Sequence, residues 1–126
     1  MKILLLSATQ QEIQPFLQHT HHVDVVIGGV GIASTIYHLT KQLMHHHYDL
    51  VLQAGIAGSF TLPAGEIVTV KQDCFGDMGA MESDQFQSLH EMKLCNEMEW
   101  IVNDHPLLST LPYKQVKAIT VNMVTD

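Results

Sequence analysis

The sequence contains no arginine. Its 126 residues carry six basic side chains, all of them lysine, against thirteen acidic ones, and the formal net charge is −7. Proteins that bind nucleic acid or anionic membrane surfaces neutralise phosphates with clusters of basic side chains. The charge therefore argues against nucleic acid and against a membrane surface as partners.

Long apolar runs and paired cysteines are missing as well. The opening MKILLLSA is followed by Gln10, Gln11 and Glu12, so its apolar run falls short of the roughly 7–15 residues of a secretory signal. No run approaches the ~20 residues of a membrane span. Cys74 and Cys95 form neither a CxxC motif nor a disulfide framework. These absences predict a cytoplasmic protein.

What the sequence does contain is short apolar segments separated by a helical pattern. Apolar residues recur at helical spacing in residues 32–46, and a shorter helix is predicted at 12–18. The segments predicted as strands are 2–6, 23–27, 48–53, 66–71 and 116–124. Residues 73–112 are polar and are predicted to be largely irregular, with one short helix. Continuous apolar strands alternating with helices predict an α/β fold with a mostly parallel sheet.

The length suits one domain. No covering helix follows the last predicted strand, whereas a parallel sheet is covered on both faces. We therefore expect residues 1–126 to form a single, incomplete domain. Apolar sheet surface left uncovered in this way predicts a homo-oligomer or a loosely folded chain.

Two segments of small residues follow predicted strands. GGVGIAS follows the second strand, and AGIAGS follows the third, in the stretch DLVLQAGIAGSF. Ligands of parallel α/β sheets bind beyond the carboxyl ends of the strands. The segments could therefore mark a ligand site, although GGVG lacks the spacing of a dinucleotide or phosphate loop and fits a plain tight turn equally well.

Glu12 has two interpretations. The stretch Thr9-Gln10-Gln11-Glu12 matches a capping box, in which Glu12 only accepts a backbone N–H at the start of a helix. A carboxylate at the end of the first strand could instead act as a general base. Glutamine could take over the cap but not the base, so Glu12→Gln is expected to separate the two interpretations.

The histidines form two clusters but show no metal-ligand spacing. Six of the nine histidines make up these clusters, namely His19, His21, His22, His45, His46 and His47. Neither cluster has a cysteine or an acidic residue at the spacing of a zinc site. Histidine is also favourable near the carbonyl end of a helix, where both clusters are predicted to lie. We predict no metal and no cofactor.

Several segments, in their order, resemble the purine nucleoside phosphorylase and nucleosidase superfamily. They are MKILLLSATQQEI, IGGVGIAST, DLVLQAGIAGSF, GEIVTVKQDCFGDMGAM and the closing TVNMVT. Within the superfamily the sequence is most similar to the futalosine hydrolases of menaquinone biosynthesis, and next to the 5′-methylthioadenosine/S-adenosylhomocysteine nucleosidases. The resemblance implies a three-layer α/β/α fold with a mixed, mostly parallel central sheet, of which this chain covers the N-terminal part.

The resemblance also implies a reaction and a set of site residues. The reaction is hydrolysis of the N-glycosidic bond of a purine nucleoside, with futalosine giving hypoxanthine and dehypoxanthinyl futalosine. Glu12 matches the residue that activates water. The substrate-binding positions implied are Val30, Gly31, Ala57, Gly58, Asn122, Met123 and Val124. The family's ribose-binding glutamate and its leaving-base acid have no counterpart here, so the chain alone is expected to be nearly inactive.

The missing arginine bears on the type of reaction. Phosphorylases of this superfamily bind phosphate with arginine, whose planar fork matches the anion. A water nucleophile needs a carboxylate base instead, which favours hydrolysis. The alternative is a non-catalytic binding or assembly module.

Overall fold

The computed structural model describes residues 1–19, 21–96 and 99–124. The chain divides into two compact units, Met1–Phe60 and Thr61–Asp126. Within the described residues, no helix combines the length and the apolar character needed to cross a membrane.

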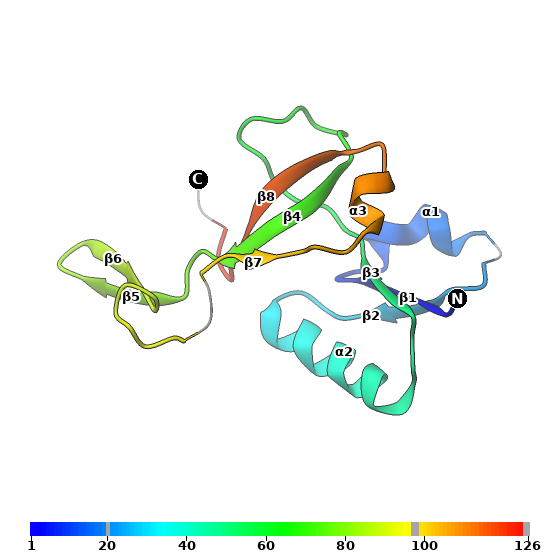
Figure 1. The fold of residues 1–126 in the computed structure, drawn as a ribbon, viewed down its shortest axis with the longest axis horizontal. Helices are drawn as coiled ribbons and strands as arrows, with labels where there is room; N and C mark the ends of the chain where they lie inside the picture. Colours follow the sequence, from blue (N-terminus) through cyan, green and yellow to red (C-terminus); the bar gives the residue numbers. More distant parts are fainter. Residues whose placement is uncertain (20, 97–98, 125–126) are drawn as a thin grey trace. The chain divides into compact units, whose positions relative to one another are not determined.

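The first unit is built on a parallel three-stranded sheet (Figure 1). Its strands are β1 (Ile3–Ser7), β2 (Asp24–Ile27) and β3 (Leu50–Gln53), in the order β2-β1-β3. The central strand β1 supplies most of the core, since Leu4, Leu5 and Leu6 are at most 5 % exposed. A central parallel strand is covered from both faces, which is why its sequence is continuously apolar.

The helices of this unit connect the strands. The 3-10 turn η1 (Gln11–Ile13) leads into the short helix α1 (Gln14–Leu17), which has a proline in its first turn, where a missing N–H costs nothing. Helix α2 (Ile32–His45) follows β2 and contacts it. Both predicted helices are confirmed, with the first one starting as a 3-10 turn.

The second unit contains a mixed sheet. Strand β4 (Val68–Phe75) pairs in antiparallel fashion with β7 (Ile101–Val102) and in parallel with β8 (Lys114–Thr120). Helix α3 (Leu107–Thr110) lies between β7 and β8 in the chain. Parallel and mixed sheets with intervening helices confirm an α/β fold.

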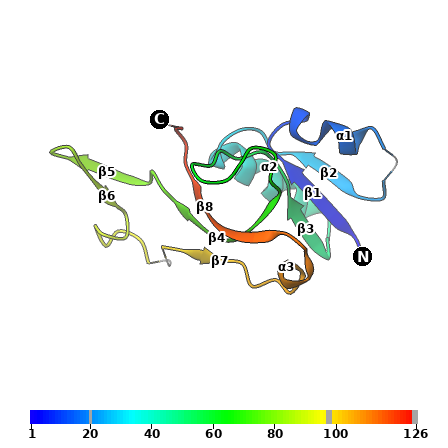
Figure 2. The ribbon, with the colours of Figure 1, turned by 90° about the horizontal axis from the view of Figure 1, so that it is seen from above.

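A β-hairpin, β5 (Gly79–Glu82) and β6 (Gln85–Ser88), extends from the end of β4 (Figure 2). Its two turn residues, Ser83 and Asp84, both have positive φ, of 48° and 64°. Positive φ at both central positions is the geometry of a turn whose twist matches the flanking strands. The sequence analysis missed this hairpin because no Asn-Gly or Asp-Gly pair marks its turn.

The predicted last strand was too long. Residues 116–124 were expected to be extended, but β8 ends at Thr120. The Asp77 carboxylate accepts hydrogen bonds from the backbone N–H groups of Asn122 and Met123, which turns the chain away from the strand direction. Residues 73–112, expected to be largely irregular, also contain β5, β6 and β7 in addition to the expected short helix.

Candidate active site

The carboxyl ends of the three parallel strands of the first unit meet at one edge. The Gly28 N–H donates to the Ser7 carbonyl oxygen at 2.8 Å, and the Ala54 N–H donates to that of Leu6 at 2.9 Å. The loops that follow β1, β2 and β3 are thereby joined where ligands of parallel sheets bind. Glu12 and both small-residue loops belong to this edge.

Both carboxylate oxygens of Glu12 accept hydrogen bonds. The Oε2 atom lies 2.9 Å from the Thr9 backbone nitrogen and 3.2 Å from the Ser7 hydroxyl oxygen. The Oε1 atom accepts the Ile56 backbone N–H at 3.2 Å. Because Ser7 ends β1 and Ile56 follows β3, the Glu12 side chain bridges the ends of two neighbouring strands.

The surroundings of Glu12 favour its charged form. Burial alone raises the pKa of the carboxyl, but hydrogen bonds from the Ile56 and Thr9 backbone and from the Ser7 and Thr9 side chains outweigh it. The net result is a pKa below the ordinary glutamate value of 4.5. Glu12 is therefore ionised at neutral pH, which is the state that a proton acceptor requires.

The capping interpretation of Glu12 is realised only in part. The carboxylate does accept the Thr9 N–H, as in a capping box. However, the 3-10 turn begins at Gln11, one position later than the box requires, and Glu12 also binds a backbone group far away in the chain, that of Ile56. A glutamine has one acceptor oxygen, so Glu12→Gln can keep the hydrogen bond from the Thr9 N–H but cannot at the same time keep the one from the Ile56 N–H on the other side.

Glycine is required at different positions of the two loops for different structural reasons. Gly31 precedes α2 with φ at 95°, a conformation that disfavours a side chain. Gly55 has ordinary φ, but a Cβ built on it would lie only 3.3 Å from Glu12 Oε1. A Cβ on Gly58 would meet nothing within 4 Å. The positive φ thus explains Gly31, and the contact with Glu12 explains Gly55. Neither reason applies to Gly58.

The remaining predicted binding residues of the first unit are accessible at this edge. Val30 is 78 % exposed, and Ala57 and Gly58 are exposed in the irregular segment after β3. The structure therefore brings Glu12 and the Gly55–Gly58 segment together and puts Val30 and Gly31 on the neighbouring loop.

The other three predicted binding residues belong to the second unit. Asn122, Met123 and Val124 follow β8, and the Asp77 carboxylate holds the first two, with Oδ2 accepting their N–H groups at 2.6 and 3.1 Å. Its Oδ1 atom also accepts the Asn122 side-chain amide at 3.3 Å. Asp77 thus fixes the segment that the resemblance assigns to nucleobase binding. The role of that segment stays a prediction.

No group of three or more His, Cys, Asp or Glu side chains that could hold a metal ion occurs among the described residues. His21 instead stacks on Phe16, with ring centroids 4.3 Å apart. His46 lies near Tyr48, with ring centroids 6.3 Å apart. These contacts show one histidine of each cluster beside an aromatic ring.

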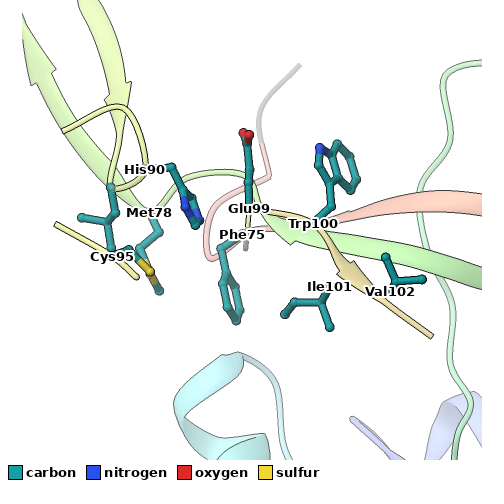
Figure 3. Close-up of a pocket in the computed structure, with 9 residues that line it drawn as sticks. Phe75, Met78, His90, Cys95, Glu99, Trp100, Ile101 and Val102 are labelled. Carbon is teal, nitrogen blue, oxygen red and sulfur yellow. The ribbon is translucent and has the colours of Figure 1, made fainter. Parts of the chain in front are cut away.

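The second unit also contains a cavity of about 540 Å³ (Figure 3). Phe75, Met78 and Trp100 contribute apolar walls, and His90 and Glu99 contribute polar groups. None of the predicted site residues lines this cavity.

Sequence reasoning missed three residues that shape the candidate site. They are Ser7, Gly55 and Asp77. A polar residue at the end of the apolar run ILLLS was a usable signal for Ser7, which is fully buried. The segment AGIAGS marked the loop of Gly55, but neither its contact with Glu12 nor the role of Asp77 had a local signal, because the partners lie more than forty positions apart in the sequence.

The chain is 31 % identical over 96 residues to a futalosine hydrolase from Acidothermus cellulolyticus. The chain is similar to a futalosine hydrolase. The match covers 75 % of this chain but only 38 % of the relative's length. No protein-family model matches the chain. No solved structure matches it either.

Proposed function

We propose that this chain forms part of a nucleosidase that hydrolyses the N-glycosidic bond of a purine nucleoside, most specifically futalosine. The observation that carries the proposal is Glu12. It is a partly buried, ionised carboxylate held at the joined ends of β1 and β3. The similarity to a futalosine hydrolase over 96 residues supports the substrate class.

In the proposed reaction Glu12 accepts a proton from a water molecule while the water oxygen bonds to the anomeric carbon. The electron pair of the glycosidic bond passes to the base nitrogen, and hypoxanthine leaves after protonation by a group for which this chain has no counterpart. General-base assistance of this kind contributes about 10²–10⁴-fold to rate.

The small-residue loops complete the proposed site. Val30 and Gly31 would line the ribose and water side, and Ala57 and Gly58 would lie against sugar and base. Gly58 supports this proposal, because neither its φ nor a neighbouring atom accounts for the missing side chain. Asn122, Met123 and Val124 would pack on the nucleobase within a three-layer α/β/α fold.

A homo-oligomer is part of the proposal. On the hairpin, Met81 and Phe86 are cross-strand partners and are 66 % and 43 % exposed. An isolated hairpin is marginally stable in water, so an apolar pair of this kind gains from burial against a second copy. Sedimentation of the Met81→Ser, Phe86→Ser double variant tests this. An unchanged sedimentation coefficient would count against assembly through the hairpin.

Hypoxanthine release from futalosine tests the function. In a protein that carries this chain together with the remaining length of its relative, release should proceed without phosphate and yield no sugar 1-phosphate. The 126-residue chain alone should show only traces of turnover. Formation of a sugar 1-phosphate would instead indicate a phosphorylase.

Binding gives a second test that does not depend on turnover. Addition of futalosine to the ¹⁵N-labelled chain should shift the amide resonances of Gly31 and Gly58. The exposed Gly65, which lies outside both proposed loops, serves as a control. Absence of any shift, together with absence of turnover, would leave a non-catalytic module as the better description.

A further inference from the structure

The two oxygens of the Glu12 carboxylate are not equivalent. An ionised carboxylate offers about two acceptor positions on each oxygen. Oε2 uses both of its positions, on the Thr9 N–H and the Ser7 hydroxyl. Oε1 uses one, on the Ile56 N–H. The Thr9 side chain is a further donor to the carboxylate, and of the three bonds described here Oε1 accepts one and Oε2 accepts two.

The Ser7 hydroxyl is placed to hold Oε2. Ser7 is 0 % exposed, and its position at the end of the central strand leaves its side chain little freedom. Its Oγ atom lies 3.2 Å from Glu12 Oε2 and also 3.2 Å from the Thr9 carbonyl oxygen. The hydroxyl has one proton and must choose between them. A charged carboxylate is the stronger acceptor.

The second acceptor becomes useful when Glu12 is protonated. The carboxyl is then neutral and no longer the stronger acceptor, and the Ser7 hydroxyl can rotate to the Thr9 carbonyl without being left unpaired. A buried hydroxyl with no partner would carry a cost, which this arrangement avoids. Ser7 therefore has a hydrogen-bond partner in both protonation states of Glu12.

We propose that Ser7 is a positioning residue that, together with the Thr9 backbone, anchors Glu12 Oε2 and leaves Oε1 as the atom that takes the proton from water. The role of the water rests on the function proposed above. In this step one O–H bond of the water breaks, its proton goes to Oε1, and its electron pair stays on the oxygen that bonds to the anomeric carbon. Ser7 itself exchanges no proton.

The test is a ¹³C NMR titration of the Glu12 carboxyl in the 126-residue chain, with the resonance assigned by its loss in Glu12→Gln. In Ser7→Ala the charged carboxylate loses one donor, so the pKa of Glu12 should rise. Ser7→Cys keeps the volume but supplies a weaker donor, and the pKa should rise there too. Gln11→Ala is the control, because that exposed side chain is not among the donors to Glu12, and its titration should match the unmodified chain.

A folded Ser7→Ala or Ser7→Cys chain with an unchanged Glu12 titration would overturn the proposal. If neither variant folds, a titration of the backbone amides in the unmodified chain still tests whether Oε2 is anchored. The Thr9 and Ile56 amide protons should both titrate together with the Glu12 carboxyl, and a Thr9 amide that does not follow would refute the anchoring of Oε2.

The proposed function and the positioning role can fail separately. In an active, complete protein, Ser7→Ala should shift the acid limb of kcat/KM to higher pH, which a purely structural role would not do. A protein that cleaves no nucleoside, but whose Glu12 pKa depends on Ser7, would refute the function alone. An active protein that loses turnover in Glu12→Gln, but keeps its acid limb in Ser7→Ala, would refute the positioning alone.

Discussion

Gly55 and Gly58 offer a matched pair of substitutions, because they lie on the same loop and only one of them touches Glu12. Both have ordinary φ, so alanine is compatible with the backbone at either position. Gly→Ala at a compatible site stabilises by about 0.4–1 kcal/mol through the unfolded chain. This gain is common to both variants and cancels when they are compared with each other.

The difference between the two variants then comes from Glu12. The new Cβ at position 55 would lie 3.3 Å from Oε1 and 3.5 Å from Cδ, so the carboxylate has to move by a few tenths of an ångström. The Ile56 N–H···Oε1 bond is already 3.2 Å long, and such a movement weakens it further. A hydrogen bond to a charged group is worth about 1.5 kcal/mol at the low end of its range, which suits a partly exposed carboxylate. Gly55→Ala should therefore be less stable than Gly58→Ala, by at most about 1.5 kcal/mol, the value for complete loss of that bond.

Urea unfolding measures this difference. Far-UV circular dichroism follows the first unit through α2, its longest helix. The fluorescence of Trp100, the one tryptophan in the sequence, reports the second unit and should not distinguish the variants. Equal urea midpoints for Gly55→Ala and Gly58→Ala by circular dichroism would show that a side chain at position 55 does not disturb Glu12 and would refute this reasoning. In the complete protein, Gly58→Ala should raise KM for the nucleoside, whereas Gly55→Ala should mainly lower kcat.

Further predictions concern the two carboxylates that organise the loops. Glu12→Gln places the side-chain NH₂ group opposite one of the backbone N–H donors, so it should lower the free energy of unfolding by about 1 kcal/mol after allowance for solvent screening. It should also reduce kcat of the complete protein by about 10²-fold or more. Because folding lowers the pKa of Glu12, its contribution to stability is present above the ordinary value of 4.5 and is lost as pH falls through the lower folded-state pKa. Urea midpoints measured against pH should therefore fall more steeply on acidification in the unmodified chain than in Glu12→Gln, and parallel profiles would contradict the lowered pKa. Asp77→Ala removes all three hydrogen bonds to Asn122 and Met123, so hydrogen exchange at those two amides should accelerate, while Glu82→Ala on the exposed hairpin leaves it unchanged.

Local pattern was sufficient for the regular elements of the first unit. The apolar run of β1, the helical spacing of α2 and the glycine before that helix each depend on residues close together in the sequence. Their physical causes are burial of one face and the conformational freedom of glycine, and both leave a periodic or single-residue signal. The α/β class followed from the same signals.

Local pattern failed in the second unit, where distant residues decide. Strand β8 ends at Thr120 because the Asp77 carboxylate binds the N–H groups that come after it, the first of them that of Asn122, 45 positions from Asp77 in the sequence. Strand β7 consists of two β-branched residues, which favour a strand, but a run of two is too short to predict one without its pairing with β4. No short window of sequence contains either cause.

In the candidate site, too, some features follow from the local sequence and others depend on contacts between distant residues. The sequence alone determined that a carboxylate and two small-residue loops follow three apolar strands, and that a resemblance assigns Glu12 to water activation. Only the tertiary structure decided how Glu12 is held, because the parallel pairing of β1 with β3 brings Gly55 and Ile56 against this side chain, which in the case of Ile56 lies 44 residues earlier. Pairing between distant strands sets which donors face a carboxylate, and those donors favour its charged form.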